Sequence, residues 1–407
     1  TADILPNTSK QWQVLEEKLH AFMTINGYKE IRTPAFEHTN LFARGVGEDT
    51  DIVSKEMYSW VDQGGTALTL KPELTAPVVR AFIQHNLNKI SPVTKLYYMD
   101  ALFRRERPQK GRLRQFHQFG VEAFGSHYPE QDAEVIAIAW SFFQSLGIRE
   151  MVLNLNSIGS SECRENYRSA LQDFLRPHLG ELSETSQQRF DTNPLRILDT
   201  KAPHEIEILQ NAPLISEFLS SEDADHFREV KANLDALHIP YTLNNRMVRG
   251  LDYYTRTTFE ITSGALGAQD ALCGGGRYDN LVETLGGKPT PAIGFAAGVE
   301  RLLLVLESEL IRDDDSVHVY TVCLGDAPRS YIMKITHKLR TMGISVGTDM
   351  LRRSMKAQMR EANKLNATLA IIVGETELEN KTVIIKELKK GTQIEIPMEK
   401  LEEAVKS

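Results

Sequence analysis

Apolar residues recur at intervals of three and four near the start of the chain, and this spacing predicts a helix with one buried stripe. The stripe consists of Trp12, Leu15, Leu19 and Phe22. Gly27 would end this helix, and residues 28–33 then predict a strand that Pro34 stops, because proline cannot donate to a strand ladder. The pattern alone indicates a core helix followed by an edge strand.

Further apolar runs predict more strands in the first three hundred residues. They cover residues 67–70, 95–103, 116–124, 151–156, 257–262 and 292–295. Strands clustered with few helices between them are typical of a largely antiparallel sheet flanked by helices. We therefore expect an α+β domain formed by residues 1–159 and 239–312.

Residues 160–238 have a different character, with helical patterns punctuated by prolines. From Ser160 to Pro240 the chain holds fifteen acidic and eight basic side chains, a net charge of −7. We interpret this stretch as an inserted helical domain. Its acidity argues against contact with a phosphate backbone over most of its surface.

After a polar linker at 312–316, strands and helices alternate. The predicted strands are 317–324, 344–348, 368–373, 381–387 and 393–396, and the predicted helices are 329–342 and 354–366. Such alternation indicates a small α/β domain, residues 317–407. This part holds fifteen Lys and Arg against eleven Asp and Glu, a net of +4, although the whole chain carries −8. The positive charge is concentrated in this C-terminal part, as expected of a domain that binds a nucleic acid.

Composition narrows the class of protein. Hydrophobic content of 41% and charged content of 25% are ordinary for a globular protein, and no run of eighteen apolar residues predicts a membrane span. The three cysteines lie far apart, and neither they nor the histidines show zinc-ligand spacing. We expect reduced thiols, a cytoplasmic location and no zinc.

Residues 103–125 concentrate the candidate chemistry. Between Arg104 and Arg114 there are six basic side chains against one acidic side chain, a net of +5, with a turn predicted by the proline and glycine within it. A solvated charged loop is the simplest explanation of such a run. On the strand that follows, however, Phe116, Gln118 and Glu122 share one face. One hairpin would then offer guanidinium groups, an aromatic ring and a carboxylate to the same cleft.

Five segments in this order resemble the signature motifs of class II aminoacyl-tRNA synthetases, and of their histidine-specific bacterial family. The segments are Thr33-Pro34, Phe103-Arg104-Arg105-Glu106 with its basic loop, Arg249-Gly250-Leu251-Asp252-Tyr253-Tyr254, Gly275-Gly276-Arg277-Tyr278-Asp279, and Gly294-Phe295-Ala296-Ala297-Gly298-Val299-Glu300-Arg301. Each motif alone is weak, but five in family order cover the chain almost end to end.

The resemblance implies an antiparallel class II sheet with a helical insertion and a C-terminal α/β anticodon-binding domain. It also implies that the first helix and strand form a homodimer interface. The opening residues resemble the interior of a family opening, so we expect a few residues before Thr1.

The resemblance also implies ATP-dependent activation of L-histidine, followed by its transfer to tRNA(His). Activation joins a carboxylate to a phosphate, so it requires cations that hold both anions in line. The catalytic residues would be Arg104 and Arg249. The ATP-binding residues would be Arg104, Glu106, Arg112, Phe116 and Arg301, with Mg²⁺ accompanying the phosphates. In isolation, each arginine would be a surface ion pair and Phe116 a core residue.

Histidine recognition needs acceptors for an ammonium group and for an imidazole N–H. By resemblance, Glu73, Thr75 and Gln118 would meet the ammonium, Glu122 and Tyr254 would face the ring, and Tyr253 and Tyr278 would line it, with Arg104 and Arg249 at the carboxylate. A structural pairing of Glu122 with a core arginine is the alternative. For tRNA contact, the candidates are Arg107, Gln109, Arg352 and Arg353.

Two other functions remain to be weighed. The synthetase-like regulatory subunit of ATP phosphoribosyltransferase binds histidine without charging tRNA, but it typically lacks the anticodon-binding domain and the arginine found here at position 249. A general RNA-binding protein would not explain the acidic body of the chain or its glutamate and tyrosine pocket.

Overall fold

The computed structural model describes residues 1–47, 50–107, 112–248, 251–264, 271–306 and 316–406. The chain forms two compact units, Thr1–Leu310 and Ile311–Ser407. Among the described residues, no helix is both long and apolar enough to cross a membrane.

The first unit is built on a sheet whose described strands follow the order β1-β5-β6-β11-β10-β9-β7-β8. Their bounds are β1 (Lys29–Glu30), β5 (Thr94–Phe103), β6 (Gln115–Phe124), β7 (Val152–Ser157), β8 (Thr242–Leu243), β9 (Thr255–Thr262), β10 (Ala271–Arg277) and β11 (Ala292–Gly298). Every pairing from β5 across to β7 is antiparallel, while β1 and β8 join the edges in parallel. The predicted antiparallel character of the sheet is confirmed.

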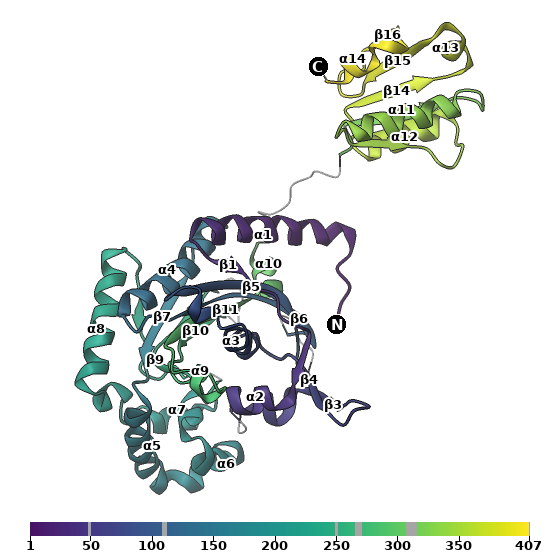
Figure 1. Ribbon diagram of the computed structural model, residues 1–407. Coiled ribbons are helices and arrows are strands. Elements are labelled where there is room, and N and C mark those ends of the chain that lie inside the picture. Colours follow the sequence, from purple (N-terminus) through teal and green to yellow (C-terminus); the bar gives the residue numbers. More distant parts are fainter. Residues whose placement is uncertain (48–49, 108–111, 249–250, 265–270, 307–315, 407) are drawn as a thin grey trace. The chain divides into compact units, whose positions relative to one another are not determined.

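One face of this sheet is covered by helices from three parts of the chain (Figure 1). They are α1 (Pro6–Ile25), α4 (Pro129–Ser145), α8 (Ser221–Ala236) and α10 (Val299–Val305). Leu15 and Leu19 of α1 are fully buried there, as the helical spacing predicts, and Phe119 and Val121 of β6 belong to the same core. Because side chains alternate along a strand, the other face of β6 carries Gln118 and Glu122.

The opposite face packs against α3 (Thr75–Gln84), α9 (Leu281–Thr284) and the inserted helices other than α8. The insertion consists of α5 (Ser161–Leu175), η3 (Arg176–Glu181), α6 (Glu184–Thr192), η4 (Pro194–Asp199), α7 (Pro203–Leu209), η5 (Ile215–Phe218) and α8. Ser160, Ser183 and Ser220 begin three of its helices, where each serine side chain accepts a backbone N–H of the first turn. Tyr167 and Leu171 join one core with Val79 of α3.

A smaller sheet with the order β2-β4-β3 extends this unit. It comprises β2 (Phe36–His38), β3 (Tyr58–Val61) and β4 (Ala67–Leu70), accompanied by α2 (Thr39–Val46) and the short helices η1 (Ile52–Glu56) and η2 (Leu87–Lys89). Of the edge strand expected at 28–33, only the residues of β1 pair in the sheet.

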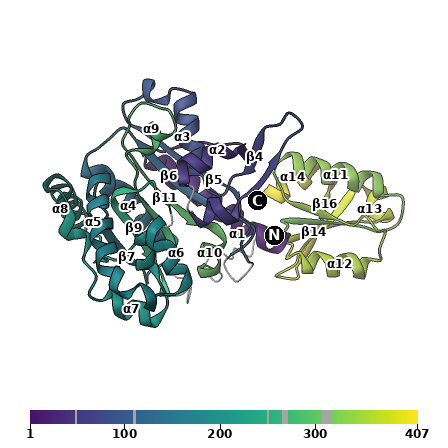
Figure 2. The ribbon, with the colours of Figure 1, turned by 90° about the horizontal axis from the view of Figure 1, so that it is seen from below.

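The second unit has a five-stranded sheet in the order β13-β12-β14-β15-β16. Its elements are β12 (Val319–Cys323), α11 (Arg329–Thr341), β13 (Val346–Thr348), α12 (Met355–Lys364), β14 (Leu369–Val373), α13 (Glu375–Asn380), β15 (Thr382–Glu387), β16 (Gln393–Pro397), η7 (Met398–Lys400) and α14 (Leu401–Lys406). Figure 2 shows α11 and α14 on one side of the sheet and α12 on the other. Separate cores beneath these two faces agree with that arrangement.

Candidate active site

Two adjoining cavities open on the sheet face opposite α1 and α4. The arginine cavity, of about 220 Å³, is lined among others by Arg104, Arg112, Phe116 and Arg301. The tyrosine cavity, of about 190 Å³, is lined among others by Glu73, Glu122, Tyr253, Tyr254 and Tyr278. Four residues line both cavities: Arg104, Gln118, Gly274 and Ala296. Phe116, Gln118 and Glu122 therefore share a face, as the strand alternation predicts.

Small residues on the central strands make room for these cavities. Gly294 of β11 pairs with Glu122 of β6, and Gly276 of β10 pairs with Gly294 in turn. A Cβ on Gly294 would lie 1.8 Å from Oε2 of Glu122. Glycine at this position therefore leaves the space that the glutamate side chain occupies.

Glu122 is buried at the base of the tyrosine cavity, with 1% of its surface exposed. Its Oε1 accepts hydrogen bonds from the hydroxyls of Thr75, at 2.8 Å, and Tyr98, at 3.0 Å, and its Oε2 accepts one from the hydroxyl of Tyr278. Burial raises the pKa of the Glu122 carboxyl to about 8, although the three hydroxyl donors act in the opposite direction. No arginine appears among these hydrogen-bond partners, so the structure offers no support for the alternative pairing with a core arginine.

Glu73 lies at the start of α3. Its two carboxylate oxygens accept the backbone N–H groups of Thr75, at 2.8 Å, and Ala76, at 2.9 Å. These donors belong to the first turn of a helix, where an anion is favoured. Burial nevertheless raises the pKa of Glu73, because it outweighs the two backbone hydrogen bonds and the nearby Arg104. The tyrosine cavity thus contains two buried acidic groups that hold protons more tightly than exposed ones would.

Aromatic rings form the wall of the tyrosine cavity. Tyr253 lies edge-on to Tyr278, with ring centroids 5.5 Å apart, and its ring is 4.7 Å from that of Tyr254. All three rings are buried. An aromatic wall with acidic acceptors suits a flat polar ring better than an aliphatic one.

Arg104 lies where the two cavities meet. Its Nε donates to the backbone carbonyl of Pro72 at 2.8 Å, and its guanidinium lies 5.2 Å from the ring centre of Phe116. Burial lowers the pKa of Arg104, while Glu106 and Glu56 act to raise it. The carbonyl and aromatic contacts orient the guanidinium, and its Nη1 lies 4.0 Å from Oε1 of Glu106.

The rest of the arginine cavity combines two more cations with a carboxylate. Nη1 of Arg112 is 3.2 Å from Oε2 of Glu106, and Nη1 of Arg301 donates to the carbonyl of Ala271 at 3.4 Å. Burial and then the charge of Arg112 lower the pKa of Arg301. A buried guanidinium group with other cations beside it, such as that of Arg301, favours an anion in the space between them.

The other candidate residues, where they are described, do not belong to the lining of either cavity. Arg107 is exposed on the basic hairpin, while Gln109 and Arg249 lie outside the described residues. In the second unit, the Arg352 side chain is 71% exposed and lies 3.8 Å from Asp326. The less exposed Arg353 forms ion pairs with Asp349 and, at 3.3 Å, with Glu361. Helix α12 begins two residues after Arg353, at Met355.

Sequence reasoning missed several lining residues. Tyr98 contacts Glu122, and Glu260 and Glu300 line the arginine cavity. Gly120 of β6 is paired with Tyr98 of β5, and a Cβ on Gly120 would lie 2.6 Å from the Tyr98 hydroxyl. A glycine within the predicted strand was therefore the sequence feature that could have indicated a large side chain beside it. Within the described part of the chain, no group of three or more His, Cys, Asp or Glu side chains is arranged to hold a metal ion.

Comparison with known proteins gives one consistent family. A family model described as histidyl-tRNA synthetase matches residues 1–302, and one described as an anticodon binding domain matches residues 318–407. The histidine–tRNA ligase of Caldanaerobacter subterraneus subsp. tengcongensis is 47% identical, over 100% of this chain and 98% of the relative.

Solved structures agree with this result. Apo histidyl-tRNA synthetase from S. aureus superposes with a TM-score of 0.84 at 40% identity, and covers 100% of this chain and 98% of that one. A Bacillus halodurans protein described as an ATP phosphoribosyltransferase regulatory subunit/histidyl-tRNA synthetase shares the fold at 22% identity, with a TM-score of 0.65 over 92% of this chain and 97% of that one.

Proposed function

The chain belongs to the histidyl-tRNA synthetase family, and from this premise we propose how its two cavities divide the work of a histidine–tRNA ligase. The enzyme uses ATP to join histidine to tRNA(His). We assign the tyrosine cavity to L-histidine and the arginine cavity to ATP. The observation that carries this assignment is the position of Arg104, which lines both cavities and can therefore contact the histidine carboxylate and the α-phosphate together.

In the tyrosine cavity, the side chains of Glu73, Thr75 and Gln118 receive the ammonium group. Glu73 keeps free lone pairs after accepting two backbone N–H groups, and the Thr75 hydroxyl can accept while it donates to Glu122. Glu122 and Tyr254 face the imidazole, whose N–H requires an acceptor in this desolvated site.

In the arginine cavity, Phe116 stacks on adenine while Glu106 meets its amino edge, and Arg112 and Arg301 hold the phosphates. Arg249 adds a second cation at the reacting centre, where its charge matters most in the transition state. Mg²⁺ binds with ATP, mainly through phosphate oxygens and water. Glu260 and Glu300 both line this cavity, so carboxylate ligands for the ion are present.

Four further assignments complete the proposal. Residues 1–159 and 239–312 form the catalytic domain, 160–238 the helical insertion and 317–407 the anticodon-binding domain. The enzyme acts as a cytoplasmic homodimer through α1 and β1. Arg107 and Gln109 contact the acceptor end of the tRNA. Arg352 and Arg353 contact the anticodon region, and the exposed Arg352 is the better placed of the two.

Histidine-dependent exchange of labelled pyrophosphate into ATP, followed by charging of purified tRNA, tests the assignment. Exchange requires both cavities, whereas a regulatory subunit would bind histidine without it. A fragment ending at Ser316 should retain part of the exchange and lose most of the charging. Its mass in solution must be measured first, because a lost dimer would have the same effect. Full charging by the fragment would contradict the anticodon-binding assignment.

A further inference from the structure

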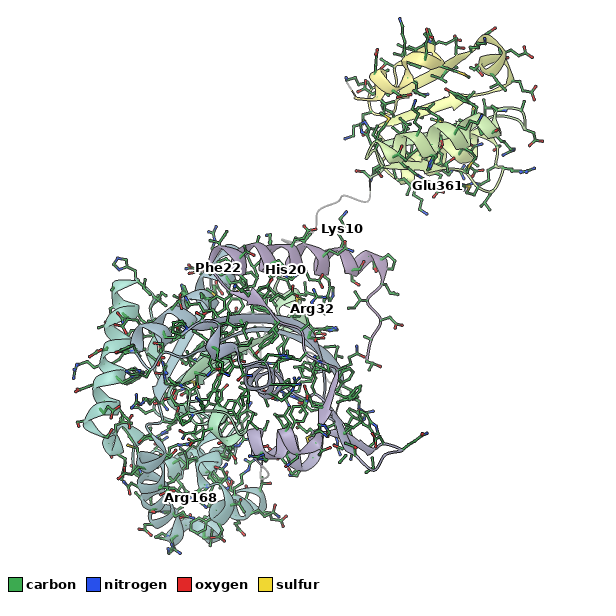
Figure 3. All side chains as sticks on the ribbon, viewed as in Figure 1. Lys10, His20, Phe22, Arg32, Arg168 and Glu361 are labelled. Atoms are coloured by element: carbon green, nitrogen blue, oxygen red, sulfur yellow. The ribbon has the colours of Figure 1, made fainter. Side chains whose placement is uncertain are left out.

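His117 lies on β6 between two residues of the arginine cavity, but its own side chain is on the opposite face of the sheet. Phe116 and Gln118 line the cavity, and His117 does not. The ring of His117 meets that of Trp12 on α1 edge-on, with the ring centroids 4.7 Å apart. Figure 3, where His20 of the same helix is labelled, shows α1 lying over the sheet. The proposed function gives His117 no role.

The hydrogen-bond partner of His117 is Glu300, in the first turn of α10. Both carboxylate oxygens of Glu300 accept the backbone N–H of His117, at 3.0 and 2.9 Å, and Nδ1 of the histidine ring lies 2.9 Å from Oε1. An ionised carboxylate only accepts hydrogen bonds, so Nδ1 carries the proton in this pair. The helix α10 is therefore bound to β6 through both the backbone and the ring of one residue.

This contact stands at the point where strand β11 becomes helix α10. The last residue of β11, Gly298, is paired with Gln118 of β6. Beyond this pair the chain turns into α10, and the N–H of His117 is accepted by the Glu300 carboxylate instead of by a strand carbonyl. Because a buried backbone N–H is costly without an acceptor, the glutamate completes the edge of the sheet and fixes the first turn of the helix.

The first turn of α10 also carries a residue of the arginine cavity. Arg301 follows Glu300 directly, lines the cavity, and donates from Nη1 to the carbonyl of Ala271 at 3.4 Å. Arg301 thus comes from α10, whereas Phe116 comes from β6. The phosphate and adenine contacts of the proposed function therefore depend on two different elements, and the pair of His117 and Glu300 joins these elements.

We propose that His117 is a positioning residue for ATP, which holds α10 against β6 and so sets the distance between Arg301 and Phe116. This inference rests on the proposed function, because it takes the arginine cavity as the ATP site. The edge of Trp12 supports the histidine ring in the orientation that directs Nδ1 to Glu300. Since His117 contacts no substrate itself, its loss should affect how well ATP is held and leave the histidine site nearly intact.

Three substitutions separate the Nδ1 hydrogen bond from the volume of the ring. His117→Ala removes the Nδ1 donor and leaves the backbone N–H. In His117→Asn the side-chain amide nitrogen takes nearly the position of Nδ1, whereas in His117→Gln it reaches farther, towards the position of Nε2. The matched control is His178→Ala, which removes the same kind of pair from the insertion, where Nδ1 of His178 lies 3.0 Å from Oε1 of Glu181.

Pyrophosphate exchange with each substrate varied in turn gives kcat and both KM values, and calorimetry with a non-hydrolysable ATP analogue measures nucleotide binding directly. His117→Ala should raise ATP KM and weaken analogue binding about tenfold, with histidine KM within about twofold of wild type, because a hydrogen bond to a charged group is lost. His117→Asn should recover most of this loss, and His117→Gln should resemble His117→Ala. His178→Ala should match wild type.

A double-mutant cycle tests whether the two residues act as a pair. In an enzyme that already carries Glu300→Gln, the further change His117→Ala should have little effect on ATP KM, because residues that share one interaction give non-additive losses. Additive losses would exclude the pairing and overturn the inference.

Three other results would also overturn it. An equal rise in both KM values of His117→Ala would make His117 structural. Recovery by His117→Gln as complete as that by His117→Asn would mean that side-chain volume, and not the Nδ1 hydrogen bond, is what matters. A higher Mg²⁺ requirement, with normal analogue binding at saturating Mg²⁺, would make Glu300 a ligand of the ion. A wild-type enzyme without exchange would instead contradict the proposed function, and analogue binding by the His117 variants would still test this inference.

Discussion

The tyrosine cavity and the arginine cavity share four lining residues, yet the groups that they bury carry opposite charges. The tyrosine cavity buries two carboxyl groups, and their pKa values are raised because water is excluded. The arginine cavity gathers three cations, and burial is the largest influence on the pKa of both Arg104 and Arg301, lowering each. In both cavities burial destabilises the charged form of the protein's own groups, and a substrate group of opposite charge would relieve that cost.

The cavities also differ in how firmly their polar groups are held. Glu122 has three hydroxyl donors and Glu73 two backbone donors, so the tyrosine cavity is preorganised by the fold. In the arginine cavity, by comparison, Arg104 and Arg301 donate to backbone carbonyls at 2.8 and 3.4 Å, and Nη1 of Arg112 lies 3.2 Å from Oε2 of Glu106. Selection of histidine should therefore depend on exact packing, whereas activation should depend on charge and reach.

The largest effect is expected where the cavities meet. Arg104→Lys should reduce pyrophosphate exchange by roughly 10²–10³-fold, because an ammonium cannot bridge two anions as a planar guanidinium does. Steady-state exchange at saturating histidine and ATP measures this loss. The matched control is Arg105→Lys, since Arg105 is exposed and lines neither cavity. A similar loss in both variants would show that the planar guanidinium groups of the segment in general, and not the position of Arg104 in particular, are what matters.

Two glycines of β11 distinguish the cavities by packing. Gly294→Ala should cost roughly 3 kcal/mol or displace Glu122, because the new Cβ would lie 1.8 Å from its Oε2. Gly298→Ala, beside the arginine cavity, would place its Cβ 3.6 Å from Arg301, an ordinary contact, and should be tolerated. Thermal unfolding and histidine KM measure both variants. Equal tolerance would mean that the tyrosine cavity is less tightly packed than these contacts indicate.

Glu122 gives the tyrosine cavity a pH dependence. Its pKa rises from 4.5 to about 8 in the folded protein, so the folded state binds this proton more tightly than the unfolded state. Its contribution to stability is fully present below pH 4.5 and is lost as the pH rises through about 8. Glu122→Gln should remove this slope and raise histidine KM roughly tenfold to a hundredfold.

Chemical denaturation from pH 5 to 9 measures the stability slope of wild type and Glu122→Gln. Calorimetry of histidine binding in buffers of different ionisation enthalpy measures the accompanying proton release, which should be smaller in the variant near pH 7.5. Superimposable pH profiles for the two proteins would show that Glu122 is ionised throughout and that another group controls the cavity.

The sequence predicted those cavity residues that follow a local pattern, and it missed those whose role depends on contacts between distant parts of the chain. Strand alternation placed Phe116, Gln118 and Glu122 on one face, because the period of two is local. Strand β10 was not predicted, because Gly274, Gly275 and Gly276 have low strand propensity. The reason for glycine at 275 and 276 is visible only in the folded sheet, where a Cβ would clash with the neighbouring strands. The ion pair between Arg277 and Asp132, both fully buried, joins residues far apart in the chain, and no local pattern predicts it.

The smallest expected effect is a change in the KM of one substrate only, caused by a substitution in the arginine cavity. Phe116→Leu keeps an apolar side chain but removes the ring that we propose stacks on adenine. The same ring supports the Arg104 guanidinium, whose centre lies 5.2 Å from the ring centre. Stacking of a base on an aromatic ring is worth roughly 1–3 kcal/mol, so ATP KM should rise about tenfold. Histidine KM should change little, because Phe116 lines only the arginine cavity of the two. Pyrophosphate exchange, measured with the ATP and histidine concentrations varied in turn, gives both KM values. Parallel rises in the two KM values would mean that Phe116 acts mainly by holding Arg104, which lines both cavities.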